Sequence, residues 1–98
     1  MKFQQWLISD ETKESIHNLH KKLHEVALES KKPTAKEMAN FTFKPYSSFM
    51  RELNPWDTQA KLSVDAFAAI VACLHRDDIL DEFVDVVRRI REDFDKRN

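Results

Sequence analysis

Three histidines are the side chains of this sequence that could hold a metal. His17, His20 and His24 recur at spacings of three and four residues, so a helix would place them broadly on one face. His20 and His24 have the i, i+4 spacing that can grip a transition metal, but no nearby cysteine or clear carboxylate completes a ligand set. We therefore expect this face to pack on a neighbouring helix, and we predict no metal site and no cofactor.

Paired carboxylates near residue 80 could in principle carry out acid–base catalysis. Asp77-Asp78 and Asp81-Glu82, however, fall in the first turn of a predicted helix, where acids are stabilised by the helix dipole. The single Cys73 has the ordinary interpretation of a small buried thiol. The sequence has no Gly, the residue that phosphate-binding loops need for close backbone approach. We therefore expect neither a nucleotide site of the P-loop or Rossmann type nor an enzyme.

The polar residues of one short predicted helix suggest a different chemistry, the reading of DNA. A recognition helix presents the side chains near its N-terminus to base edges, while Lys and Arg beside it neutralise phosphates. Arg51 is the best candidate base reader, because a guanidinium can pair with two acceptors of guanine. The competing interpretation is that this helix fills a corner of the bundle, with Arg51 paired to a nearby acid. The candidate DNA-binding residues are Lys36, Lys44, Tyr46, Ser47, Ser48, Arg51 and Lys61.

Two short helices between residues 33 and 57 would position these side chains. Thr34 and Glu37 have the spacing of a capping box, so a helix begins here and is expected to end at about Asn40 in a left-handed conformation. Pro45 fits the first turn of the next helix, which Asn54-Pro55 ends. Two short helices across a sharp turn are typical of helix-turn-helix DNA-binding proteins, and also of any small bundle that changes direction.

Three further helices flank this pair. The first is capped by Ser9 or Asp10 and carries an apolar stripe of Ile16, Leu19, Leu23 and Val26. The fourth begins at Ser63 and has enough apolar surface to be the central buried helix. The fifth opens at Asp77 or Asp78. The apolar residues 3–8 are expected to pack across the core as a lead-in or a brief helix. The sequence thus predicts one all-α domain over residues 1–98, about five helices in a small bundle with a helix-turn-helix at roughly 34–54.

The long C-terminal amphipathic helix has an apolar stripe that exceeds what a domain of this size needs for its own core. Apolar surface of that extent usually seeks a partner, so we expect residues 78–95 to be an oligomerisation helix. A dimer would also bring two reading helices into register with DNA half-sites. The alternative is that this helix packs back on the first helix, whose stripe is also long. The candidate oligomerisation residues are Phe83, Val86, Val87, Ile90 and Phe94.

The segment at residues 44–57 carries a resemblance to a known family. It reads Lys-Pro-Tyr-Ser-Ser-Phe-Met-Arg-Glu-Leu-Asn-Pro-Trp-Asp, and it is followed by Ala-Lys-Leu at residues 60–62 and by an apolar helix at residues 65–74. This pattern resembles the phage regulatory protein CII family, small helical DNA-binding proteins of prophages. The resemblance covers roughly residues 34–80 and implies transcriptional control in a lysogeny decision. Phe41 and Phe43 in the turn before the segment, and the acidic tail helix, depart from the pattern.

Charge and composition set limits on these interpretations. The net charge is −1, and residues 1–61 carry ten Lys/Arg against eight Asp/Glu, whereas residues 62–98 carry six against nine. Any basic face must therefore come from the first part, and the contrast is mild beside typical nucleic-acid binders. A single cysteine fits a reducing compartment, and no stretch is apolar enough for a signal peptide or a membrane span, so we expect a cytoplasmic protein.

Two functions therefore remain open. The first is a prophage-type transcription regulator that binds duplex DNA as a dimer or higher oligomer. The alternative is a non-enzymatic helical adaptor that binds a host or phage protein through an aromatic patch. That patch would consist of Phe41, Phe43, Tyr46 and Trp56.

Overall fold

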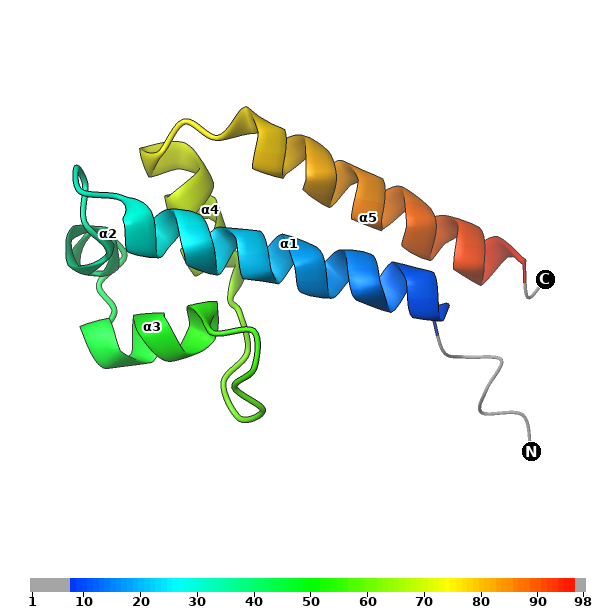
Figure 1. The fold of residues 1–98 in the computed structure, drawn as a ribbon, viewed down its shortest axis with the longest axis horizontal. Helices are drawn as coiled ribbons and strands as arrows, with labels where there is room; N and C mark the ends of the chain where they lie inside the picture. Colours follow the sequence, from blue (N-terminus) through cyan, green and yellow to red (C-terminus); the bar gives the residue numbers. More distant parts are fainter. Residues whose placement is uncertain (1–7, 97–98) are drawn as a thin grey trace.

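The computed structural model describes residues 8–96, and in that range the chain forms five α-helices and no strand. The two long helices run antiparallel and side by side, and the three short ones gather at one end of this pair (Figure 1). The predicted all-α fold is thus confirmed. The expected lead-in at residues 3–8 lies, apart from Ile8, outside the described residues. The helices are α1 (Asp10–Glu29), α2 (Ala35–Phe41), α3 (Tyr46–Leu53), α4 (Val64–Cys73) and α5 (Asp77–Asp95).

Side-chain caps fix where three of these helices begin. The Ser9 hydroxyl accepts a hydrogen bond from the backbone N–H of Thr12, and the Ser63 hydroxyl accepts one from Ala66 at the start of α4. Thr34 and Glu37 form both hydrogen bonds of a capping box. These caps satisfy N–H groups that have no partner within the helix, so the local sequence alone sets the starting points.

The turn after α2 differs from the prediction. Asn40 was expected in a left-handed conformation, but it is helical, and α2 continues to Phe41. The left-handed residue is instead Phe43, with φ of 58°. Its N–H donates to the Asn40 carbonyl oxygen, and the Lys44 N–H donates to that of Ala39, so the turn closes on the last carbonyls of the helix. The left-handed residue therefore lies three positions later than expected.

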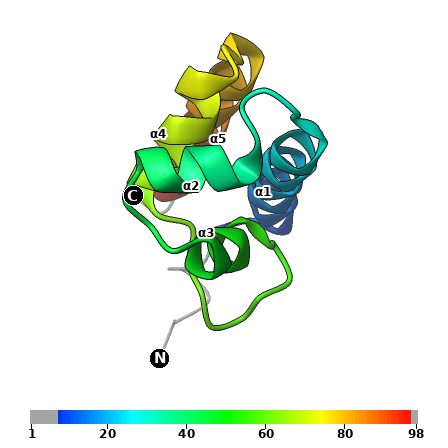
Figure 2. The same ribbon diagram turned by 90° about the vertical axis from the view of Figure 1, so that its left-hand side faces the viewer.

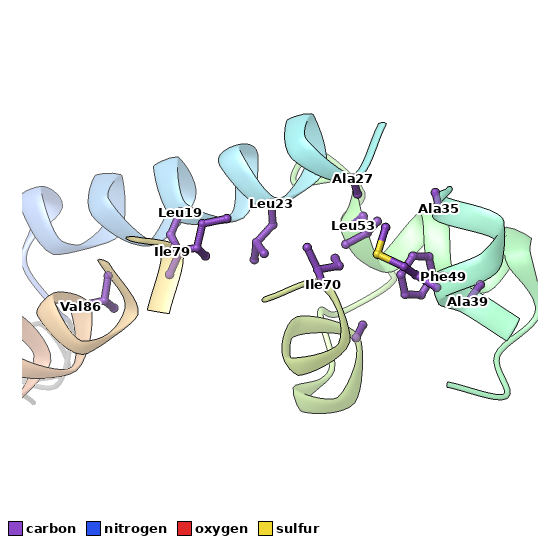
Figure 3. Packing of buried hydrophobic residues seen from close by; sticks show 12 residues of the cluster. Leu19, Leu23, Ala27, Ala35, Ala39, Phe49, Leu53, Ile70, Ile79 and Val86 are labelled. Carbon is purple, nitrogen blue, oxygen red and sulfur yellow. The ribbon is translucent and has the colours of Figure 1, made fainter. Parts of the chain in front are cut away.

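One continuous core joins the cluster of short helices to the α1–α5 pair. Leu23, Phe49 and Ile70 are fully buried where α1, α3 and α4 meet, and Leu19 faces Ile79 between α1 and α5 (Figure 3). Ile16 was predicted in the buried stripe of α1, yet it is about one third exposed, because the groove beside it lies open. The buried cluster consists of Leu19, Leu23, Ala27, Ala35, Met38, Ala39, Phe49, Leu53, Ala66, Ile70, Ile79 and Val86.

Seen from the end, α2 crosses between α1 and α4, and α3 lies below it on the outside of the bundle (Figure 2). The prediction that α4 is the central buried helix holds for one of its faces only. Ala66, Ala69 and Ile70 are buried, whereas Val64 and Ala68 are exposed. This arrangement leaves one face of α3 open to solvent.

Candidate nucleic-acid interface

The helix α3 has one buried and one open face. Phe49 and Leu53 are completely buried, while Ser47, Ser48 and Arg51 are exposed. The open face is the one predicted from the sequence, with Tyr46 about half exposed at its start. Pro45 precedes the helix, and no side chain caps its first turn. The N–H groups there can therefore donate hydrogen bonds to an anion from outside, as those of helix N-termini commonly do.

The guanidinium of Arg51 is held by the loop that follows α3. Its Nε donates to Asp57 Oδ2 at 3.0 Å, and Asp57 Oδ1 accepts the backbone N–H groups of Gln59 and Ala60 at 2.8 and 2.9 Å. These bonds, that from Arg51 most of all, hold the pKa of Asp57 far below its usual range. The bond uses Nε, whereas Arg76 donates to Asp78 through both Nε and Nη2. Arg51 is thus paired to a nearby acid, while 55% of its own side chain stays exposed.

Lys44, a predicted phosphate anchor, is bound to two acids instead of extending into solvent. Its Nζ lies 3.0 Å from Glu52 Oε2 and 3.5 Å from Asp65 Oδ1. The hydrogen bond to Glu52 is the main reason that the pKa of Lys44 is raised. Only 20% of its side chain is exposed. The lysine therefore links the turn after α2 to α3 and α4.

Glu52 connects three helices. Its carboxylate accepts hydrogen bonds from Lys44 and from both the backbone N–H and the hydroxyl of Ser63, the cap of α4. Burial raises the pKa of Glu52, but these hydrogen bonds together lower it more, so the net shift is downward. Its carbonyl oxygen lies 2.8 Å from His20 Nε2, which donates when that nitrogen carries the proton. Glu52 therefore fixes α3 against α1 and α4.

Residues 51–54, which belong to the segment that carries the family resemblance, all take part in this connection. Leu53 is completely buried, and Asn54 Oδ1 accepts the backbone N–H of Trp56 at 3.0 Å. Together with the bonds of Arg51 and Glu52, these contacts shape the passage from α3 to α4. The motif therefore accounts for the local fold whether or not the chain binds DNA.

The histidine face of α1 packs on the same region. The rings of His17 and Trp56 meet edge to face with centroids 5.3 Å apart, and His20 contacts the last turn of α3 as described above. Within residues 8–96, no group of three His, Cys, Asp or Glu side chains is arranged to hold a metal ion. These histidines thus contact neighbouring segments at the end of the bundle.

Two predicted phosphate contacts remain open to solvent. Lys36, in the first turn of α2, and Lys61, in the loop before α4, are exposed, and neither forms an ion pair with another described residue. Residues 34–65 as a whole hold four Lys/Arg and four Asp/Glu. The positive potential of this region is therefore local and comes from a few side chains.

The four aromatic residues of the predicted patch are divided by α3. Phe41 and Phe43 are 72% and 97% exposed in the turn before the helix, and Tyr46 begins it. Trp56 follows the opposite end of α3 and contacts His17. Because eight helical residues span about 12 Å, the structure groups the first three and separates Trp56 from them.

Sequence reasoning missed the role of Glu52. Glu52 and Ser63 are eleven residues apart and belong to different helices, so neither periodicity nor a capping pattern relates them. The one sequence signal in this region is Ser63 as the cap of α4. It indicates where α4 begins, but it does not indicate which group accepts the backbone N–H of Ser63.

Comparison of the chain with models of protein families, with curated proteins and with solved structures gives no match. Among the helices described here, none combines the length and apolar character needed to cross a membrane.

Proposed function

We propose that this chain is a prophage-type transcription regulator that binds duplex DNA through the open face of α3. The main support for the proposal is the composition of this open face of α3. Tyr46, Ser47, Ser48 and Arg51 lie there, on a helix whose Phe49 and Leu53 are buried on the other face. A rigid amphipathic helix at the edge of a small bundle is the element that enters a major groove. A cytoplasmic location belongs to the same proposal.

Arg51 is the proposed base reader. In the free protein Asp57 holds its guanidinium through Nε, and on DNA the terminal nitrogens pair with the O6 and N7 atoms of guanine. Lys36 and Lys61 contact phosphates. Lys44 acts indirectly, because its bonds to Glu52 and Asp65 keep α3 in place.

A titration of fluorescent duplexes that cover the DNA flanking the gene tests this proposal. We expect binding that weakens steeply with added salt, and a loss of affinity of about 5- to 100-fold in Arg51→Ala. Asp57→Asn is the matched control, because it removes the ion pair but keeps the guanidinium and an oxygen acceptor, so its affinity should not fall. Lys21→Ala removes an exposed cation of α1 and should change little. Absence of binding at low salt, or equal loss in all three variants, would refute the proposal.

A specific observation favours protein binding as a second candidate function. Phe43 is almost completely exposed and left-handed, a conformation that Asn or Gly adopts at lower cost. An exposed aromatic pair of Phe41 and Phe43 is the kind of group that anchors a protein interface. If the chain fails to bind DNA and a protein co-purifies with it, the variant Phe41→Ser/Phe43→Asn should lose that protein while Trp56→Ser retains it.

A further inference from the structure

The ion pair between Arg51 and Asp57 leaves the outer edge of the guanidinium unbonded. Asp57 Oδ2 accepts the Nε–H of Arg51 at 3.0 Å, and neither terminal nitrogen of this arginine forms a hydrogen bond with a residue between 8 and 96. Arg76 differs, because its Nε and Nη2 both donate to Asp78 at 2.8 Å. The pair at Arg51 therefore fixes the inner nitrogen and leaves both terminal nitrogens for another partner.

The carboxylate of Asp57 is held in place by bonds that do not involve Arg51. Its Oδ1 accepts the backbone N–H groups of Gln59 and Ala60. Its own backbone N–H donates to the carbonyl oxygen of Asn54, at the end of α3, at 3.1 Å. Only 17% of the Asp57 side chain is exposed, against 55% for Arg51. The acid is therefore the fixed member of the pair, and the bond between them restricts the arginine.

The unbonded edge of Arg51 has the shape to pair with guanine. Guanine presents two acceptors, O6 and N7, in the major groove, whereas adenine presents one acceptor and one donor there. Two terminal nitrogens can donate to both acceptors of guanine while Nε stays bonded to Asp57. Because the guanidinium is already ordered in the free protein, less side-chain entropy is lost when it pairs with the base.

The same ion pair restricts what else Arg51 can bind. A free arginine that faces the wrong base can turn to the nearest phosphate, and such contacts carry no sequence information. Lys36 and Lys61 have this freedom, because neither forms an ion pair with another described residue. Arg51 lacks it as long as Asp57 holds Nε. Affinity is thereby withheld from sequences without the matching base, which is one of the two ways to achieve specificity.

We propose that Asp57 is a positioning residue that makes Arg51 selective for guanine. It presents the terminal nitrogens of Arg51 to O6 and N7, and it keeps the guanidinium from phosphates at other sequences. This role rests on the proposed binding of duplex DNA through α3. It assigns part of the sequence specificity to an acid that touches no base.

The restraint on Arg51 can be measured in the free protein by nuclear magnetic relaxation of arginine Nε–H groups. In the full chain, the Nε–H of Arg51 should be nearly as rigid as that of Arg76. It should be more rigid than that of Arg88, which forms no ion pair with a described residue. In Asp57→Asn, the amide oxygen can stay with the loop N–H groups while the amide nitrogen faces Arg51, so the Nε–H should become mobile. Equal mobility of Arg51 in parent and variant would overturn the proposal.

Selectivity is measured by titration of duplexes that differ at the one guanine whose preference is lost in Arg51→Ala. Adenine at this position should weaken binding of the parent about 5- to 100-fold, whereas inosine, which keeps O6 and N7, should bind like guanine. In Asp57→Asn, affinity for the guanine duplex should stay close to that of the parent. Affinity for the adenine duplex should rise about two- to five-fold, because the released arginine reaches a phosphate. The slope of log affinity against log salt for that duplex should then steepen by up to about one.

Two further variants separate positioning from a general effect on the loop. Asp57→Ser keeps a hydroxyl that supports such a turn but is too short to reach Arg51, so it should lose selectivity like Asp57→Asn. In an Arg51→Ala background, Asp57→Asn should leave the ratio of the two affinities unchanged. A parent that binds no duplex would refute the DNA-binding function and this role with it. A parent that prefers guanine, together with a folded Asp57→Asn of equal preference and salt slope, would refute the role of Asp57 alone.

Discussion

The carboxylate of Glu52 accepts both the backbone N–H and the hydroxyl of Ser63, so the end of α3 is bonded to the cap of α4. Lys44 Nζ donates to the other carboxylate oxygen, and only 14% of the Glu52 side chain is exposed. A largely buried carboxylate is stable only with such partners. One acid therefore organises the region that presents α3.

Replacement of Glu52 by Gln should destabilise the fold. The amide keeps the shape but loses the charge that Lys44 and Ser63 bind, and it adds donors where donors already point. We expect a loss of about 1–3 kcal/mol in the free energy of unfolding at pH 7, measured by urea titration. Glu25→Gln, at an exposed position of α1, should change it by less than about 0.5 kcal/mol. Equal stabilities of the two variants would contradict this role for Glu52.

The pH dependence of stability should change in the same variant. The pKa of Glu52 is lowered in the folded chain from its ordinary value of 4.5, so the folded state favours the charged form. Its contribution is complete above pH 4.5 and is lost as the pH falls through the lower folded pKa. Asp57 and Asp78 act in the same direction. The difference between parent and Glu52→Gln in urea titrations should therefore shrink below pH 4.5, and a difference that stays constant would argue against this pKa shift.

Phe43→Asn should raise stability. The left-handed conformation costs a non-glycine residue about 1 kcal/mol, and Asn adopts it more readily than Phe. Since the Phe43 side chain is almost entirely exposed, its removal sacrifices little packing. We expect a gain of about 0.5–1 kcal/mol in thermal or urea unfolding. Phe41→Asn, at the exposed helical end of α2, relieves no such strain and should give no gain. A loss of stability in Phe43→Asn would show that this ring packs on the fold.

The two open lysines give a prediction that depends on the proposed DNA binding. Each of Lys36→Ala and Lys61→Ala should weaken binding to all sequences alike and lower the slope of log affinity against log salt by about one. Lys44→Ala should act differently, because its charge is already bound by Glu52 and Asp65. It should lower thermal stability and leave the salt slope close to that of the parent. A full unit of slope lost in Lys44→Ala would instead identify it as a phosphate contact.

The beginnings of the helices could be predicted because their signals are local. Ser9, Ser63 and the Thr34–Glu37 box each act over three residues, and the structure has all of them. Packing partners could not be predicted in the same way. On α5, Val86 and Val87 are adjacent apolar residues, yet the first is buried and the second exposed. From the pattern of this helix, either valine could face the core. Only the position of α1 determines which of the two is buried.

The candidate site could be predicted only in part, because local patterns indicate some of its features and the whole fold determines the others. The amphipathic pattern of α3 indicates its open face correctly, because periodicity determines which side chains share a side. The acids that bind Lys44 and Arg51 come from neighbouring segments whose approach depends on the whole fold. A pairing of Arg51 with an acid was foreseen only as an alternative, and the identity of that acid required the structure.

The hydrogen bond from the Ser9 N–H to Asp93 Oδ2 joins the start of α1 to the end of α5 across 84 residues of sequence. By contrast, α2, α3 and α4 contact one another over short stretches of chain. Closing a long loop costs more entropy than closing short ones and slows the step that requires it. We expect the three short helices to assemble early and the α1–α5 pair to close last, so that amides of α2–α4 gain protection first in pulsed hydrogen exchange. The apolar groove between α1 and α5 would then have both of its walls only after the final folding step.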